Sequence, residues 1–175
     1  MGIVCIDTQI LYWATVKKAV HGADELMALA GDFMKWVEAE EHNVLIPTIV
    51  VGELLIPIPD EHTEVVLSQF NEDWMIVPYD LKAARIFSRL RRDVIIKNRI
   101  HNIRKLHPDV TKRELSADLM IVATAMAYDA DCLYSHNEDM RSIAEGFILA
   151  KNFLDESFQR SMRFPSDGHS DGEHE

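Results

Sequence analysis

Four carboxylates in this 175-residue chain lie within or directly beside apolar segments, where an unpaired negative charge is costly. They belong to Asp7, Glu53, Asp118 and Asp139. No Lys or Arg lies between Asp118 and Asp139 to offset the charges there. A divalent metal ion is therefore the natural partner for these acids. Because the donors are hard oxygens and no Cys or His stands at zinc spacing, the sequence favours Mg²⁺ or Mn²⁺.

Each of these acids also admits a purely structural interpretation. Asp7 follows an apolar run and precedes a helix, so it could serve only as the N-cap of that helix. Glu53 could face solvent, although the aliphatic residues on both sides of it cover most directions. If the acids instead share one pocket, their mutual repulsion should raise at least one pKa in the metal-free protein. His136 is a further candidate, as a general base, although a divalent ion can activate water without an imidazole.

The elements that must position these acids alternate along the chain between short apolar strands and helices. Strands are expected at residues 3–6, 43–46, 74–78, 132–134 and 147–150. Helices are expected from residue 10 onward and at 24–41, 47–55, 60–71, 80–103, 116–128 and 140–145. A capping-box pattern at 111–114 opens the buried helix that carries Asp118. This alternation predicts an α/β fold with a parallel sheet, in which functional sites lie at the carboxyl ends of the strands.

Charge is strongly segregated along the chain. The net charge is −11, which at first sight argues against a nucleic-acid partner. Between residues 85 and 113, however, ten Lys or Arg residues accompany only two acids, a local balance of +8. In a regular helix over 80–103, one face would present Arg85, Arg89, Arg92 and Arg99. This face is either an ordinary solvated surface or a contact for the phosphate backbone of a nucleic acid.

Composition is that of a soluble globular protein, with 47% hydrophobic and 27% charged residues. The length suits one domain over residues 1–155, and we expect the polar, acidic segment 156–175 to be a mobile extension. No apolar run is long enough to span a membrane, and the N-terminus lacks the basic region of a signal peptide. We therefore expect a cytoplasmic protein without membrane contact, in which Cys5 and Cys132 are buried, reduced thiols.

Together, these segments resemble the motifs of the PIN-domain family of metal-dependent nucleases. The resemblance rests on Asp7 after the first strand, Glu53 within Val-Val-Gly-Glu-Leu-Leu, the Ala-Asp pair ending at Asp118 and a Ser-x-Asn-x-Asp pattern ending at Asp139. It covers roughly residues 3–153. The family implies a single-domain, three-layer α/β/α sandwich with a sheet of parallel strands in the order 3-2-1-4-5, and often a homodimer. It also implies cleavage of single-stranded RNA, as in the VapC-like toxins of toxin–antitoxin pairs, whose partner is a small antitoxin protein.

Carried over residue by residue, the resemblance assigns roles to the four acids. Asp7, Glu53 and Asp118 match the three best-kept acids of the family. Asp7, Asp118 and Asp139 are implied to hold the metal directly or through water, and Glu53 to ligate or orient a water molecule. The implied reaction is an in-line displacement at a phosphodiester, with Mg²⁺ or Mn²⁺ activating the attacking water.

The fourth motif of the family departs from its usual form in this chain. The family pattern is Thr-x-Asp-x-Asp-Phe, whereas residues 135–140 read Ser-His-Asn-Glu-Asp-Met. Ser135 keeps the hydroxyl and Asp139 keeps the second acid, but Asn137 replaces the first acid. An amide oxygen can still ligate a metal or hold a water molecule, although it adds no negative charge. Positioning roles toward ligands or substrate are implied for Thr8, Ser135 and Asn137.

Two further hypotheses remain open on the sequence alone. The first is a PIN-like RNA-binding or scaffold protein with weak or no hydrolytic activity, which the amide of Asn137 would favour. The second is an unrelated α/β phosphatase or hydrolase. The sequence offers the second little support, because it has no Asp-x-Asp start, no Gly-rich phosphate loop and no Gly-x-Ser-x-Gly elbow.

Overall fold

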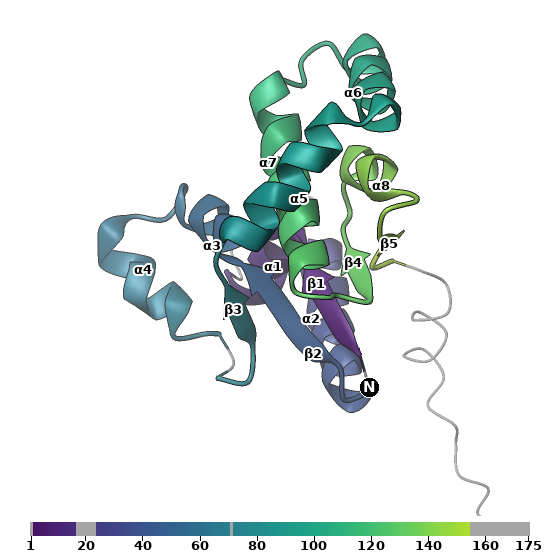
Figure 1. Cartoon of the computed structure of the whole chain (residues 1–175). Coiled ribbons are helices and arrows are strands. Elements are labelled where there is room, and N and C mark those ends of the chain that lie inside the picture. The colour runs from purple at the N-terminus through teal and green to yellow at the C-terminus, as the bar shows by residue number, and fades with distance from the viewer. Residues whose placement is uncertain (1, 17–23, 71, 155–175) are drawn as a thin grey trace, which may run out of the picture.

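A sheet of five parallel strands forms the middle layer of the protein (Figure 1). The computed structural model describes residues 2–16, 24–70 and 72–154. Within these ranges the strands lie in the order β3-β2-β1-β4-β5, and every pairing is parallel. The strands are β1 Ile3–Ile6, β2 Asn43–Pro47, β3 Met75–Val77, β4 Cys132–Tyr134 and β5 Leu149–Lys151. The predicted parallel sheet and its strand order are therefore confirmed.

Burial explains why the central strands are continuous apolar runs. Cys5 of β1 lies opposite Leu45 of β2 and Leu133 of β4, and all three side chains are fully buried. Strands that are covered on both faces have no side on which a polar residue could meet water. The edge strands β3 and β5 have only three residues each, and they carry the exposed side chains of Ile76 and Leu149.

Helices cover both faces of the sheet and complete the three expected layers. α1 and α2 pack together on one face, and α5 and α7 pack together on the opposite face (Figure 1). The helices within the described ranges are α1 Thr8–Thr15, α2 Asp24–Ala39, α3 Thr48–Leu55, α4 Asp60–Leu67, α5 Leu81–Arg92, α6 Val94–Leu106, α7 Lys112–Ala127 and α8 Glu138–Ala144. α6 lies above the carboxyl end of the sheet, between α5 and α7 in the chain (Figure 1).

The single helix predicted over residues 80–103 is wrong. The chain forms two helices there, α5 and α6, which are separated at Asp93, where the backbone is extended at φ −63° and ψ 137°. The Asp93 carboxylate accepts hydrogen bonds from the N–H groups of Ile95 at 2.7 Å and Ile96 at 3.3 Å, and so caps α6. An Asp that bonds nearby backbone N–H groups competes with continuation of the helix, which accounts for the break.

Capping residues also set the starts of α7 and α8. The predicted capping box is confirmed: the Thr111 hydroxyl accepts the Glu114 N–H at 3.1 Å, and the Glu114 carboxylate accepts the Thr111 N–H at 2.7 Å. α8 begins two residues earlier than predicted, at Glu138, because the side chain of Asn137 caps it. Both helices therefore start where a side chain satisfies their first backbone N–H groups.

The folded domain reaches at least to Phe153, whose side chain is fully buried. The predicted extension at 156–175 lies outside the described residues, so its mobility stays a prediction. Both cysteines are buried and unpaired, as expected, and burial raises the pKa of the Cys132 thiol to about 11. In the part of the chain that the structure describes, no helix is both long and apolar enough to cross a bilayer.

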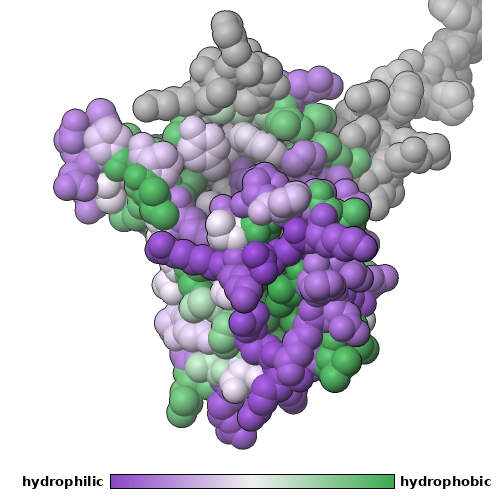
Figure 2. All heavy atoms as spheres, turned by 90° about the horizontal axis from the view of Figure 1, so that it is seen from above, coloured by the Kyte–Doolittle hydropathy of each residue, from purple (hydrophilic) through white to green (hydrophobic). Residues whose placement is uncertain are grey.

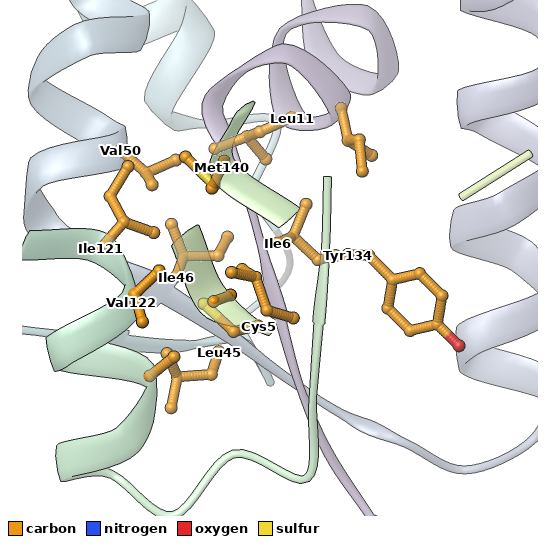
Figure 3. Packing of buried hydrophobic residues seen from close by; sticks show 14 of the residues in the cluster. Cys5, Ile6, Leu11, Leu45, Ile46, Val50, Ile121, Val122, Tyr134 and Met140 are labelled. Atoms are coloured by element: carbon orange, nitrogen blue, oxygen red, sulfur yellow. The ribbon is translucent and has the colours of Figure 1, made fainter. Parts of the chain in front are cut away.

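The core joins the sheet to helices on both of its faces. Figure 3 shows buried side chains from β1, β2 and β4 meeting those from α1, α3 and α7. On the α2 side, the ring of Phe33 is fully buried, with its centroid 4.8 Å from that of Tyr134 and 5.9 Å from that of Phe153. These rings connect α2 to the strand that leads into the fourth motif.

Replacing Phe33 with alanine should lower the free energy of unfolding by about 3–5 kcal/mol, because it removes a buried ring and leaves a cavity. Phe33→Leu keeps most of the volume and should cost only roughly 1–2 kcal/mol. Urea unfolding followed by circular dichroism measures both. Equal losses for the two variants would show that volume at this position does not support the core.

Candidate active site

Three of the four predicted acids line one pocket at the carboxyl end of the sheet. The pocket has a volume of about 290 Å³. Its lining residues are Glu53, Asp109, Val110, Glu114, Asp118, Asn137 and Asp139. Its walls come from α3, α7, α8, the N-cap of α8 and the α6–α7 loop, which the parallel sheet brings to the same end. Figure 2 shows this end of the molecule from above, with hydrophilic side chains spread over much of it.

The fourth acid, Asp7, is buried beside the pocket, with 2% of its surface exposed. Its Oδ1 accepts the Ile10 N–H at 3.1 Å and caps α1, while its Oδ2 accepts a hydrogen bond from the Ser135 hydroxyl. Burial raises the pKa of Asp7 to about 6, and these hydrogen bonds partly offset the effect. The N-cap interpretation is thus confirmed, yet Asp7 also lies near enough to the pocket for its charge to raise the pKa of Asp118.

Glu53 is held by the first residue of α1. The Thr8 hydroxyl donates a hydrogen bond to Glu53 Oε2 at 2.5 Å, across a separation of 45 residues. Glu53 is half-buried and lines the pocket, so the interpretation of a side chain that simply faces solvent is wrong. Thr8 therefore fixes one oxygen of an acid on the neighbouring helix α3.

The pKa of Asp118 shows how unfavourable ionisation is in this pocket. Its pKa is raised to about 7, first by burial and then by the charges of Glu53, Asp7, Asp139 and Glu114. Like charges in a poorly solvated pocket oppose ionisation, so at least one acid keeps its proton near neutral pH when no cation is present. The expected rise of a pKa in this set of acids is found at Asp118.

The fourth motif forms a compact hydrogen-bonded turn before α8. The Ser135 hydroxyl is fully buried, donates to Asp7 and accepts the Asn137 N–H at 3.0 Å. The Asn137 side-chain oxygen accepts the N–H groups of Asp139 at 2.9 Å and Met140 at 3.4 Å. That oxygen is therefore engaged with the helix it caps, rather than with the centre of the pocket. Ser135 likewise acts by holding Asp7.

Three residues at the site were not singled out by sequence reasoning. Asp109 and Glu114 line the pocket, and His107 contacts Asp139, with 3.0 Å between Nδ1 and Oδ2. One signal was available for Glu114: it stands four residues before Asp118, so both lie on the same face of α7. The positions of His107 and Asp109 depend on the path of the α6–α7 loop, which no local spacing reveals.

His136 does not line the pocket. Its ring packs edge-on against Trp13 at 5.3 Å and Phe153 at 5.8 Å between centroids. Its Nδ1 is buried without a hydrogen-bond partner in the described part of the chain. The structure therefore places the candidate general base within an aromatic cluster rather than among the pocket acids.

The four arginines predicted on one helix face do not stay together. Arg85, Arg89 and Arg92 line an open groove of about 910 Å³ along α5. Arg99 lies on α6, where its guanidinium donates to the backbone oxygens of Ile143 and Glu145 at the end of α8. The break at Asp93 separates Arg99 from the other three, so the predicted four-residue face is corrected to three.

The donor set of the pocket fits a hard divalent cation. Five of its seven lining residues are acids and none is Cys or His, which suits ions that prefer oxygen ligands. As the side chains stand, no three Asp, Glu, His or Cys residues within the described ranges are grouped closely enough to hold one ion. An ion in this pocket would be held by fewer than three of these side chains together with water molecules, as is common for Mg²⁺.

Comparison with known proteins identifies the family. A family model of the PIN domain matches residues 4–146, which is most of the chain. The chain therefore belongs to the PIN domain family, whose members are generally nucleases. This membership removes the hypothesis of an unrelated α/β phosphatase. No curated protein sequence matches the chain significantly.

Similar solved structures share the fold. One of them is VapBC2 from Rickettsia felis, solved with a DNA fragment from the promoter of its genes. It has a TM-score of 0.57 and 18% sequence identity, and the match covers 86% of this chain and 98% of that chain. FitAcB from Neisseria gonorrhoeae has a TM-score of 0.53 and 16% identity, covering 86% and 97%. DNA-bound VapBC from Salmonella typhimurium has a TM-score of 0.53 and 15% identity, covering 87% and 99%. At these identities the likeness is one of fold.

The raised pKa of Asp118 predicts a pH dependence of stability in the metal-free protein. As pH rises from the ordinary Asp value of 3.8 to about 7, the unfolded chain loses a proton that the folded protein retains. The unfolded state then binds fewer protons, so the free energy of unfolding should fall across this window. Asp118→Asn should remove much of the fall and raise stability at pH 8 by roughly 2 kcal/mol.

Urea unfolding in EDTA at several pH values between 5 and 8 measures this effect. Glu40→Gln, which changes an exposed acid, is the matched control and should follow the wild-type profile. An Asp118→Asn profile that is parallel to wild type would contradict the raised pKa.

Proposed function

We propose that this protein is a Mg²⁺- or Mn²⁺-dependent endoribonuclease that cleaves phosphodiester bonds in single-stranded RNA. The observation that carries the proposal is the convergence of Glu53, Asp118 and Asp139 on one pocket, beside buried Asp7, in a PIN domain. The rise in the pKa of Asp118 supports it, because it reflects burial of this acid and the charges of the other acids around it.

Each acid has a proposed role that follows from its surroundings. Asp118 and Asp139 on the pocket wall would hold the cation. Asp7, buried beside the pocket, would hold it directly or through water. A bound divalent ion supplies Lewis-acid stabilisation of negative charge and lowers the pKa of a water molecule. Glu53, with one oxygen fixed by Thr8, would use the other to orient the attacking water. As the water oxygen bonds to phosphorus it would release a proton to solvent, the bond between phosphorus and the leaving oxygen would break, and the leaving oxygen would take up a proton from solvent.

The proposed RNA contact is the groove along α5. Arg85, Arg89 and Arg92 line it together with Lys82, so one groove carries four cations. Such a surface binds phosphates without reading the sequence of the nucleic acid. The acidic pocket would repel the same phosphate backbone unless a cation is bound there. In this proposal the groove therefore binds the RNA, and the pocket with its cation cleaves it.

The proposed biological role is that of a toxin in a toxin–antitoxin pair. The resemblance to VapC-like toxins and the structural likeness to VapBC and FitAcB support a small antitoxin protein as the partner. A homodimer, which the resemblance also implies, and a cytoplasmic location complete the proposal.

A second function, RNA binding with weak or no hydrolysis, is favoured by one observation. The oxygen of Asn137, which replaces an acid of the family motif, is engaged in capping α8. The pocket therefore has one charged ligand fewer than the motif normally supplies, although Asp109 and Glu114 add acids from elsewhere. Cleavage and binding measured on the same RNA separate the two functions.

Asp7→Asn and Asp118→Asn should each slow cleavage of a single-stranded RNA in Mg²⁺ or Mn²⁺ by about 100-fold or more, equivalent to roughly 3 kcal/mol in the barrier. Each variant removes a charge on which the cation depends. Gel analysis of an end-labelled RNA, with and without EDTA, measures the rates.

Glu38→Gln, an exposed acid on α2, is the control and should cleave like wild type. Cleavage that survives Asp7→Asn would point to a contaminant or another site and would sink the proposal. Binding without any cleavage by wild type would instead support the second function.

The double variant Arg89→Glu/Arg92→Glu should bind RNA more weakly and with a flatter salt dependence, because each lost phosphate contact lowers the slope by about 0.7 for single strands. Fluorescence anisotropy at several salt concentrations, in an Asp7→Asn background that prevents cleavage, measures this.

Arg91→Glu/Arg104→Glu makes the same change of charge with residues that are exposed but absent from the groove lining. If both double variants lose affinity equally, net charge and not the α5 groove governs binding.

A further inference from the structure

Helix α8 carries Asp139 in its first turn. Arg99 of α6 contacts the C-terminal end of α8, and His107, the C-cap of α6, contacts its N-terminal end. α6 and α8 also pack against each other. The position of α8 decides where Asp139 points, because the residue is fixed to the helix backbone. Whatever holds α8 therefore also holds one acid of the pocket.

Arg99 holds the C-terminal end of α8. Its guanidinium donates to the carbonyl of Ile143 at 3.4 Å and to the carbonyl of Glu145, and it pairs with the Glu145 carboxylate at 3.3 Å. The last carbonyls of a helix have no partner within the helix and carry its partial negative charge. Arg99 of α6 satisfies two carbonyls here, those of Ile143 and Glu145, which ties the end of α8 to α6.

His107 holds the other end through Asp139 itself. Its Nδ1 lies 3.0 Å from Asp139 Oδ2, and His107 immediately follows α6 as its C-cap. An ionised carboxylate only accepts hydrogen bonds, so Nδ1 must donate, which the neutral imidazole can also do. Asp139 has 15% of its side chain exposed, compared with 51% for His107. The more exposed ring therefore contacts one oxygen of a mostly buried acid.

The backbone of Asp139 also has a hydrogen bond of its own. Its N–H donates to the Asn137 side-chain oxygen at 2.9 Å. With the backbone held by Asn137 and Oδ2 held by His107, little freedom is left in the direction of Oδ1. A carboxylate whose outer oxygen is hydrogen-bonded is a better-oriented ligand for a metal ion.

We propose that α6 is a brace for α8 and that His107 is a positioning residue, which orients Asp139 for the divalent cation. The proposal rests on the proposed function, because it assumes that Asp139 is a ligand. The brace belongs to the strongly basic segment from residue 85 to 113, so that segment also helps to shape the acidic pocket. His107 itself touches neither the ion nor the RNA in this role.

Mn²⁺ titration of the whole protein by isothermal calorimetry tests the brace without measuring activity. His107→Leu should weaken Mn²⁺ binding by about 10-fold to 100-fold, as expected when the hydrogen-bond partner of a metal ligand is lost. His107→Asn should restore most of the affinity, because the Asn amide nitrogen replaces Nδ1 at the same distance along the side chain and can donate. Arg99→Leu, remote from the pocket, should also weaken binding, by loosening α8.

His101→Leu is the matched control, since it removes an exposed imidazole from α6 and should leave Mn²⁺ affinity unchanged. Circular dichroism shows whether each variant is folded. Hydrogen exchange of the Asp139 amide reports the order of the first turn of α8 without metal, and His107→Leu should speed it.

The outcomes separate this proposal from the proposed function. Wild type that binds Mn²⁺, loses it on Asp118→Asn and keeps full affinity in His107→Leu would overturn the positioning role alone. Tighter binding by His107→Leu would also overturn it, since the ring would then be blocking the acid. Failure of wild type to bind Mn²⁺ at all would overturn both.

Discussion

The burial of carboxylates is the constraint on which the arrangement of this molecule depends. Burial raises the pKa of Asp7 to about 6, and burial together with the charges of neighbouring acids raises the pKa of Asp118 to about 7. The apolar core of β1, β2 and β4 and the helices around them must offset that cost. Two hydroxyl groups donate hydrogen bonds to these acids: Thr8 to Glu53, and Ser135 to Asp7.

Most of the fold could be predicted because its signals are local. Short apolar runs between helices specify buried parallel strands. Functional sites lie at the carboxyl ends of such strands, which correctly predicted that Glu53, Asp118 and Asp139 share one pocket. Asp7 was placed correctly as a helix cap, and it is a neighbour of the pocket as well. For these residues, one sequence feature satisfies both a structural and a chemical requirement.

The rest of the site could not be predicted, because it depends on how distant segments meet. Asp93 ends α5 through hydrogen bonds that a charge pattern does not show, and this single residue moves Arg99 away from the other arginines. His107 and Asp109 reach the pocket only through the path of the α6–α7 loop. The role of Asn137 as the cap of α8 was also not predicted: its side-chain oxygen accepts two N–H groups at the start of that helix.

Because β1 lies in the middle of the sheet, between β2 and β4, the pocket can form only when both halves of the domain are present. Ile3 pairs with Asn43 of β2, but Val4 pairs with Cys132 of β4, near the other end of the domain. The contact between Asp7 and Ser135 likewise joins residues near the two ends of the domain. A nascent chain on the ribosome therefore cannot assemble the pocket until residue 139 has been synthesised, when nearly the whole domain is complete.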